Sequence, residues 1–372
     1  MAERLSRSLL SPRTPMSNTS TQSKTFLSRK LIAFFISDPS RKPQKPKSTE
    51  EDVQDAKLIY YHPSYKVIEE KRRQVGMIEG LATFTESFAG PSNPLESIHT
   101  KQHILVVKQW EPNIWITLVS RNPQSITMKG NSVSEVLWHE GDTQETFLMA
   151  ILKNLCAFFV LLHGSIRHYI LENRIDALTD LLEDFIPAFF ETVDTDKISL
   201  YNELNGFYYG PISQKTFLSI QSFVHRLKDA FSTIRYVSLL FDGYLIYNGM
   251  NPHDMLVLYS YLVCYNGSVD SLKLNTFPFG RAPTAASEPG GGASTFGRAN
   301  FLKESDGYLF GSSRSSLFVP TLYFSDATSG KLVVLLFRRI VLIVIFEDTE
   351  TVTDEKIFQN YTPMYISLLI RH

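Results

Sequence analysis

The chain has 372 residues, 43% of them apolar, a length that corresponds to two or three ordinary domains with buried cores. Its 37 lysines and arginines nearly balance its 38 aspartates and glutamates, for a formal net charge of −1. A dedicated nucleic-acid-binding protein needs a marked basic excess, so that class is excluded. Cys156 and Cys264 lie far apart in apolar stretches, which excludes a disulfide framework and indicates a reducing compartment.

The first 29 residues are rich in Ser, Thr, Arg and Lys, with Glu3 as the one acid, and are predicted to form a disordered tail. A mitochondrial transit peptide shares this composition, but the segment has no amphipathic stripe. The most apolar segment, Leu332–Phe346, has 15 residues and carries Arg338 and Arg339. A membrane-spanning helix needs about 20 apolar residues, so we predict two paired strands here.

Residues 30–195 are predicted to form a first unit of strands and helices. Apolar runs predict strands at 31–36 and 58–61 and a hairpin of 104–107 with 114–119. Between them, a helix is expected from Glu69 to the residue before Gly90, because four apolar side chains recur at helical spacing: Met77, Leu81, Phe84 and Phe88. Two apolar helices are expected to follow, at 147–162 and 171–189.

The same order of elements begins again in a second predicted unit, residues 196–272. It has a strand ending at Tyr209, a helix with apolar spacing from Phe217 to Phe231, and a hairpin turning at Asp242-Gly243. A last helix is expected with Asn251 as its N-cap. A flexible linker rich in Gly and Ser, 273–306, leads to a partial third unit, 307–372, with strands but little helix to cover them.

Motifs for small-molecule chemistry are absent from the sequence: there is no phosphate loop, dinucleotide fingerprint, HExxH or GxSxG. No catalytic residue, cofactor site or metal site is predicted. His163 and His168 have the nearest spacing to a metal pair, but they are five positions apart across Gly164, which favours a helix end. His139 and Asp142 are a weaker catalytic pair, and a helix cap at Asp142 or Thr143 explains them more simply.

Two surfaces are candidates for contacts with partners. Trp110 and Trp115 flank the turn of the predicted hairpin, where an exposed aromatic side chain would anchor a protein contact. The basic loop Arg41–Lys47 has the charge to contact anionic lipid, although a solvated loop has the same composition.

The order of strands and helices resembles the longin fold, an α/β/α sandwich found in membrane traffic, here as tandem units with the third incomplete. Three segments carry a closer resemblance to the vacuolar fusion protein family named for calcium-caffeine-zinc sensitivity (Ccz-one): Leu204–Pro211, Phe217–Leu227 and Gly249–Leu262. The segments Leu31–Asp38, Leu58–Pro63 and Gly76–Phe88 are similar to that family's first longin region. The resemblance covers about 30–270 and fades beyond.

This resemblance implies a subunit of a heterodimeric guanine-nucleotide exchange factor, with Mon-one as partner and a Rab-seven-type GTPase as target. It further implies a cytoplasmic protein, peripheral on late-endosomal and lysosomal or vacuolar membrane through anionic phosphoinositides, in vesicle traffic and autophagy. The residues expected to contact partners are Met77, Phe84, Trp110 and Trp115. The short third unit puts the family's assembly and membrane docking in doubt.

Two other functions remain open from the sequence. A longin adaptor of a trafficking complex would share the fold and bind partners without accelerating nucleotide release. An unrecognised enzyme would need a concave pocket around His139 and Asp142.

Overall fold

The computed structural model describes residues 23–27, 30–43, 47–90, 94–129, 132–139, 145–193, 209–266, 307–308, 319–337 and 339–348. Its first large sheet is antiparallel, in the order β3-β2-β6-β5-β4. The strands are β2 Lys30–Ser37, β3 Leu58–His62, β4 Ser97–His99, β5 His103–Glu111 and β6 Ile114–Arg121. The strands and the hairpin predicted between 31 and 119 are therefore confirmed.

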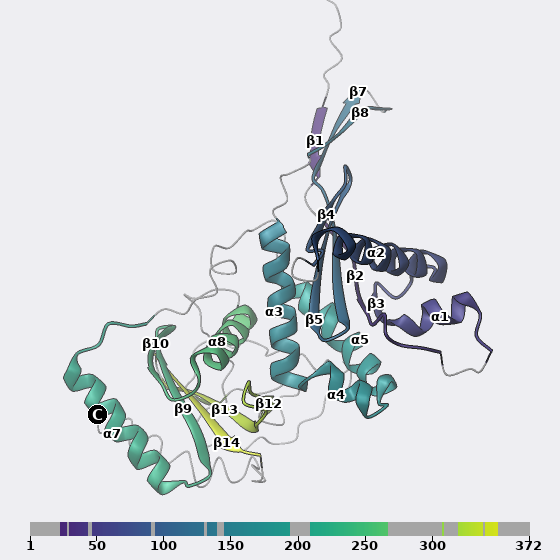
Figure 1. The fold of residues 1–372 in the computed structure, drawn as a ribbon. Helices are drawn as coiled ribbons and strands as arrows, with labels where there is room; N and C mark the ends of the chain where they lie inside the picture. The colour runs from purple at the N-terminus through teal and green to yellow at the C-terminus, as the bar shows by residue number, and fades with distance from the viewer. Residues whose placement is uncertain are drawn as a thin grey trace, which may run out of the picture.

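Helices cover both faces of this sheet (Figure 1). One face packs against α2, Ile68–Ala89, and α1, Glu50–Lys57, is held beside that helix. The other face packs against α3, Glu145–His163, and α5, Ile175–Thr192. The short helix α4, Ile166–Leu171, lies between α3 and α5 in the chain. Side chains alternate accordingly: Phe35 packs in the cluster under α2, and Phe34 in the cluster under α3 and α5. The α/β sandwich predicted for the first unit is confirmed.

A second sheet has the order β10-β9-β14-β13-β11, with β12 paired to β13. Its elements are α7 Gln214–Ala230, β9 Ile234–Phe241, β10 Tyr244–Asn248, α8 Pro252–Asn266, β11 Gly307–Tyr308, β12 Thr321–Tyr323, β13 Ser329–Phe337 and β14 Ile340–Glu347. The sequence analysis assigned β9 and β14 to separate units, but these strands pair with each other along their length. The expected partial third unit is thus corrected: its strands complete the sheet of the second unit.

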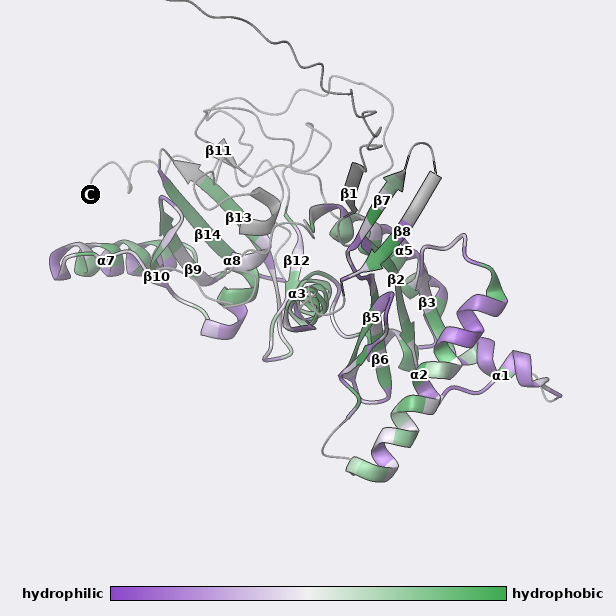
Figure 2. Cartoon of the chain, turned by 90° about the horizontal axis from the view of Figure 1, so that it is seen from above, coloured by the Kyte–Doolittle hydropathy of each residue, from purple (hydrophilic) through white to green (hydrophobic). Residues whose placement is uncertain are grey.

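The continuous apolar run of β13 and β14 has a physical reason in this pairing. Val333 and Leu335 pack in the cluster under α7, whereas Leu332 and Val334 pack in the cluster with α8 and α3. A strand covered on both faces needs no polar alternation, so the run reads as apolar throughout (Figure 2). Strand β14 lies inside the sheet, between β9 and β13, and presents no open edge.

Helix α3 stands between the two sheets and is shared by both units (Figures 1 and 2). It is long and apolar enough to cross a membrane, but 56% of its most apolar window is buried inside the protein, which is typical of a core helix. The ring of Phe158 in this helix contacts Phe189 of α5, with centroids 6.0 Å apart, and Tyr261 of α8, with centroids 5.7 Å apart. One hydrophobic core therefore extends from the first sheet to the second.

A third, smaller sheet projects from the first unit (Figure 1). Its order is β1-β7-β8, with β1 Ser23–Leu27, β7 Gln124–Lys129 and β8 Ser132–Trp138. Residues 23–27 were expected to belong to a disordered tail, but they pair with β7 because that strand offers them a free edge. Residues 1–22, the linker and all of 349–372 lie outside the described residues.

Local turn and cap signals of the second unit are also confirmed. Asp242 and Gly243 both have positive φ, 49° and 81°, as a two-residue hairpin turn requires. The Asn251 side chain accepts a hydrogen bond from the His253 backbone N–H at 2.9 Å and caps α8. The predicted strand ending at Tyr209 lies outside the described residues, apart from a single bridge of Tyr209 to Leu245.

Candidate partner interface

Helix α2 is built so that only a narrow stripe faces the sheet. Glu69 and Glu70 favour its positive N-terminal end, and Gly90 ends it at φ 76°, with its N–H bonded to the Glu86 carbonyl at 3.0 Å. Of its 22 residues, only Val75 and Ile78 are buried. A long helix with so little buried surface leaves most of its circumference facing solvent.

The outward face of α2 carries large apolar side chains. Met77, Phe84 and Phe88 are 43, 61 and 78% exposed, and the rings of Phe84 and Phe88 lie 4.7 Å apart. Exposure of this aromatic pair to water is unfavourable, and the pair adds nothing to the hydrophobic core. The structure therefore places Met77 and Phe84, both predicted as contact residues, on one surface and adds Phe88 to them.

Two glycines share this outward face. A β-carbon built on Gly76 or Gly80 would meet no atom within 4 Å. Each glycine lowers helix stability by about 1 kcal/mol relative to alanine, and the described residues supply no packing reason for either one. The Gly-x-x-x-Gly spacing is visible in the sequence, but neither the two glycines nor Phe88 is among the predicted contact residues.

The two tryptophans do not share a surface. Trp110 packs in the core on the α3 side, edge-on to Phe159 at 5.4 Å, whereas Trp115 packs on the α2 side. The reason is the register of the hairpin. Gln109 pairs with Trp115, so these two side chains share a face, and Trp110, the next residue, points to the opposite face. The register shift between Gln109 and Glu111 is what prevents Trp110 from pairing with Trp115. Trp110 is thus half-buried against the core on the α3 side, and its contact with a partner stays a prediction.

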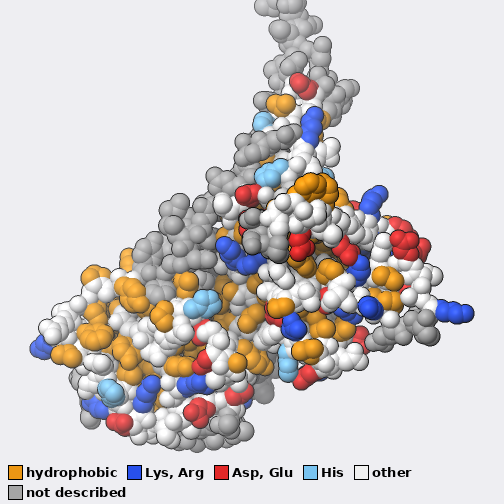
Figure 3. All heavy atoms as spheres, viewed as in Figure 1, with side chains coloured by type: hydrophobic (Ala, Val, Ile, Leu, Met, Phe, Trp, Pro, Cys, Tyr) orange, Lys and Arg blue, Asp and Glu red, His pale blue; other side chains and the backbone are white. Residues whose placement is uncertain are grey.

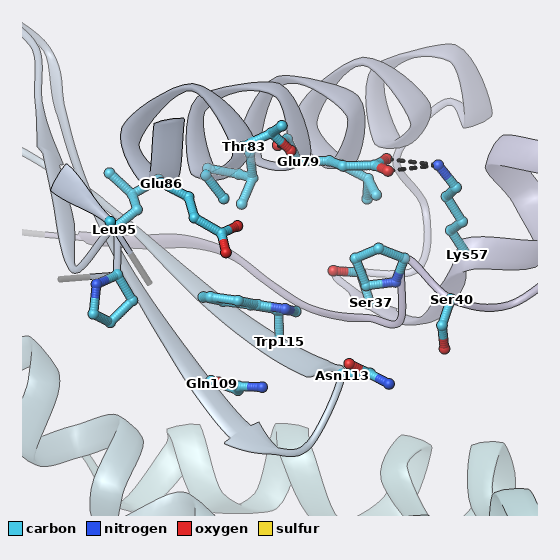
Figure 4. Close-up of a pocket in the computed structure, with 16 residues that line it drawn as sticks. Ser37, Ser40, Lys57, Glu79, Thr83, Glu86, Leu95, Gln109, Asn113 and Trp115 are labelled. Carbon is cyan, nitrogen blue, oxygen red and sulfur yellow. Dashed lines mark hydrogen bonds and ion pairs between the residues drawn. The ribbon is translucent and has the colours of Figure 1, made fainter. Parts of the chain in front are cut away.

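A groove of about 570 Å³ separates α2 from the β5–β6 hairpin (Figure 4). Trp115 lies across its middle, below Thr83 and Glu86 of the helix, and Leu95 closes one end. At the other end Lys57 and Glu79 form an ion pair at 2.6 Å. The groove borders the helix whose outward face carries Met77 and Phe84, so both features belong to one side of the first unit.

Charges hold α1 against α2. Helix α1 has no buried side chain, and Thr49 and Asp52 form a capping box at its start. Arg72 of α2 donates to Asp55 at 2.6 and 2.7 Å and to Glu51 at 2.9 Å. The hydrogen bond to Asp55 raises the pKa of Arg72. Acidic and basic side chains are interspersed on this side of the surface (Figure 3).

We expect Arg72→Ala to release α1 without unfolding the sheet. No side chain of the helix is fully buried, so its attachment depends mainly on this arginine and on the pair between Lys57 and Glu79. Hydrogen exchange should show lost protection for 50–57 while the amides of β5 and β6 stay protected. Arg73→Ala, an exposed neighbour, is the control, and equal protection in both variants would contradict the expectation.

The histidines proposed as alternatives are not brought together as a reactive site. His163 ends α3, as predicted, while His168 is an exposed residue of α4, 3.2 Å from Glu172. The His139 ring lies 3.0 Å from the Ser125 hydroxyl, and Asp142 is outside the described residues. Among the described residues, no group of three metal-ligating side chains occurs.

His163 makes a separate prediction about stability. Its ring packs against Phe159 and Phe185, its buried Nε2 has no hydrogen-bond partner among the described residues, and burial lowers its pKa to about 4. Between about pH 6.5 and pH 4 the unfolded chain binds a proton there that the folded chain does not. We therefore expect stability to fall by about 3 kcal/mol as pH drops through this window.

Chemical denaturation across this pH range measures the effect. His163→Leu should flatten the loss, whereas His168→Gln, at an exposed position, should leave it unchanged. Identical slopes for the parent chain and His163→Leu would exclude His163 as the source.

Comparison with known proteins bears on the first unit most directly. Residues 33–164, from β2 to the end of α3, match the family model described as the first longin domain of INTU, CCZ1 and HPS4. The chain is 29% identical over 233 residues to the vacuolar fusion protein CCZ1 homolog of Tetraodon nigroviridis, which covers 62% of this chain and 47% of the relative. The chain is similar to CCZ1 proteins over about three fifths of its length.

Two further CCZ1 homologs support this result. The Nematostella vectensis protein is 30% identical over 243 residues, 65% of this chain and 51% of the relative, and the Dictyostelium discoideum protein is 25% identical over 236 residues. The resemblance to the Ccz-one family stated from the sequence is confirmed. The chain spans about half the length of the curated relatives it matches.

The residues that match the longin model include every element around the groove. The matched range holds α2, the β5–β6 hairpin and the short edge strand β4. Helix α5 lies beyond the matched range, although Phe185 and Phe189 pack into the same core. The outward face of α2 is therefore a surface of the longin domain itself.

Proposed function

We propose that this chain is one subunit of a heterodimeric guanine-nucleotide exchange factor, with Mon-one as the second subunit and a Rab-seven-type GTPase as the target. The observation that carries the proposal is the outward face of α2, where Met77, Phe84 and Phe88 are exposed on a CCZ1-type longin domain. Exposed aromatic and Met side chains are enriched in protein interfaces, and a partner helix or sheet would remove them from water.

The proposed mechanism requires no phosphate-binding motif in this chain. An exchange factor accelerates release by binding the nucleotide-free GTPase more tightly than the loaded form, which displaces a switch segment that phosphate and magnesium hold in place. A hundredfold difference in affinity between the two forms corresponds to about 2.7 kcal/mol. The binding surface, shared between two longin subunits, has to supply that difference.

The names of the relatives, vacuolar fusion proteins, support a place for this chain in traffic to the vacuole or lysosome. We propose that it acts in the cytoplasm, peripherally on late-endosomal or lysosomal membrane containing phosphoinositides, including during autophagy. The basic loop Arg41–Lys47 is our candidate for the lipid contact, although three of its residues, 44–46, are outside the described range.

Release of a fluorescent nucleotide from a Rab-seven-type GTPase tests the proposal. We expect acceleration when this chain is co-expressed with Mon-one, and the intrinsic rate with either subunit alone. If the pair assembles but release stays intrinsic across a panel of Rab proteins, exchange is excluded for this chain. Preferential binding of the GTP-loaded form would then identify a longin adaptor.

A further inference from the structure

Three side chains that can carry positive charge form a row across the first sheet, at the end where β2 begins and β6 ends. Lys30 of β2 lies directly opposite Arg121 of β6, and Arg121 lies directly opposite His103 of β5. Directly opposite residues of neighbouring strands share a face, and like charges in such positions repel. Val119 and Leu105, each two positions along its strand from this basic row, pack in the cluster under α2. The basic row therefore lies on the α2 face of the sheet.

The charges of the basic row are not paired within the described part of the chain. Lys30 and Arg121 are exposed, and no described acidic side chain forms an ion pair with either one. The pKa of His103 is lowered by burial first and then by the charges of Arg121 and Lys66. Lys66 pairs with Glu70 at 2.7 Å and belongs to the loop that joins β3 to α2. This loop therefore borders the basic row.

Other charged groups near this end leave the positive charge in excess. Lys101 is exposed in the turn before β5, and its carbonyl accepts a hydrogen bond from the Asn122 side chain at 3.2 Å. Glu69, exposed in the first turn of α2, is an acidic side chain that no ion pair among the described residues uses. Glu145 starts α3 on the opposite face of the sheet, 3.2 Å from the His99 ring. The basic row is thus a place where an acidic ligand would relieve repulsion.

Apolar side chains stand beside this charge. In the loop that joins β3 to α2, Tyr65, Val67 and Ile68 are 83, 63 and 40% exposed. The Lys71 ammonium of α2 donates to the Ser64 carbonyl at 2.8 Å, which holds the loop in place. A loop that is held in place loses little entropy when a partner covers its apolar side chains. Contact with an apolar side chain would therefore be favourable next to the basic row.

The surroundings of the basic row favour a protein segment over a lipid bilayer. The small sheet continues from the same strands, since β1 ends at Leu27 and β7 begins at Gln124, and it projects beyond this end of the first sheet (Figure 1). A flat bilayer would meet the projecting sheet before it met the basic row. A peptide segment has no such restriction, because it can follow the surface from the row to the loop.

We propose that the basic row and the loop beside it bind an acidic segment of another protein. Carboxylates of that segment lie over Lys30 and Arg121, and a large apolar side chain packs against Tyr65 and Val67. Charge complementarity brings the segment to this surface, and the apolar contact adds affinity. The site is separate from the outward face of α2 and does not depend on the exchange activity proposed above.

Fluorescence anisotropy with a defined peptide tests the charges. The probe is fluorescein-labelled Gly-Phe-Asp-Glu-Asp-Gly, titrated with the full chain at low ionic strength. Arg121→Glu should weaken binding at least about tenfold and should bind Gly-Phe-Lys-Lys-Lys-Gly better than the parent chain does. Lys215→Glu reverses an exposed charge on α7 and should stay within about twofold. If the acidic probe does not bind the parent chain, or if both variants lose the same affinity, the proposal is wrong.

A double-mutant cycle tests the apolar contact. The variant Tyr65→Ala/Val67→Ser and a probe in which Gly replaces Phe should each weaken binding at least about fivefold, and the two changes together should cost little more than one of them. Leu171→Ala, at a position 74% exposed on α4, is the control and should have no effect. Fully additive losses would exclude contact between the loop and the apolar side chain of the probe.

Sedimentation with vesicles of phosphatidylcholine and phosphatidylserine distinguishes a lipid site from a protein site. Arg121→Glu is expected to sediment with these vesicles to the same extent as the parent chain. Reduced vesicle binding by this variant, together with unchanged affinity for the acidic peptide, would identify a lipid site and overturn the proposal.

Discussion

Gly249→Ala is expected to lower the free energy of unfolding by about 3 kcal/mol, an effect at the upper end for a single added methyl group. A β-carbon at this position would lie 2.5 Å from the Val237 carbonyl oxygen, which is backbone and cannot rotate away. Val237 lies in β9 and pairs with Val344 of β14, so any displacement is passed to the interior of the sheet. Denaturant titration followed by near-ultraviolet circular dichroism measures the loss.

Gly80→Ala is the matched control for this prediction. The same methyl group at Gly80 meets no atom within 4 Å, and alanine is a better helix former, so stability should rise by about 1 kcal/mol. Opposite signs for the two variants are the expected result. A loss at Gly80 equal to that at Gly249 would mean that steric contact in the folded chain is not the cause.

The second large effect concerns the outward face of α2. We expect the double variant Met77→Glu/Phe84→Glu to weaken binding to Mon-one at least about thirtyfold, because two carboxylates would replace apolar side chains at the centre of the proposed contact. Both positions are exposed, so the stability of the isolated chain should change by no more than about 0.5 kcal/mol. Isothermal titration or co-purification with quantified yield measures the affinity.

Leu218→Glu is the control for this prediction, since Leu218 is 55% exposed on α7, in the other unit. Gly80→Ala adds a sharper comparison: it should stabilise the free chain and yet weaken Mon-one binding if the partner backbone approaches α2 closely. Unchanged affinity in the double variant would remove the α2 face from the proposed interface, while the exchange assay would still test the function.

Local elements of this protein followed well from the sequence. The spacing of apolar residues distinguished the helix at Glu69–Ala89 from the strands around it. In the second unit, Asp242-Gly243 identified the turn of the β9–β10 hairpin. Both signals depend on neighbours within a few residues, where backbone sterics and side-chain periodicity act directly. The motifs of the longin regions likewise sufficed to recognise the CCZ1 relatives.

The functional surface followed only in part. Met77 and Phe84 belong to the apolar stripe that predicts the helix, but periodicity does not say which stripe faces the sheet. In the structure Val75 and Ile78 face the sheet instead. Trp110 and Trp115 appeared equivalent beside one turn, and a single irregularity in the register sends them to opposite faces.

The sequence by itself determined the units of local structure and the resemblance to the CCZ1 proteins, because these depend on short-range periodicity, turn chemistry and motifs. The tertiary structure alone decided that β14 pairs with β9 across about 100 residues and that α3 serves both sheets. An apolar run records only that both faces of a strand are buried. Which strand it joins is decided by packing of the whole chain, since every interior position in either sheet would satisfy the same run.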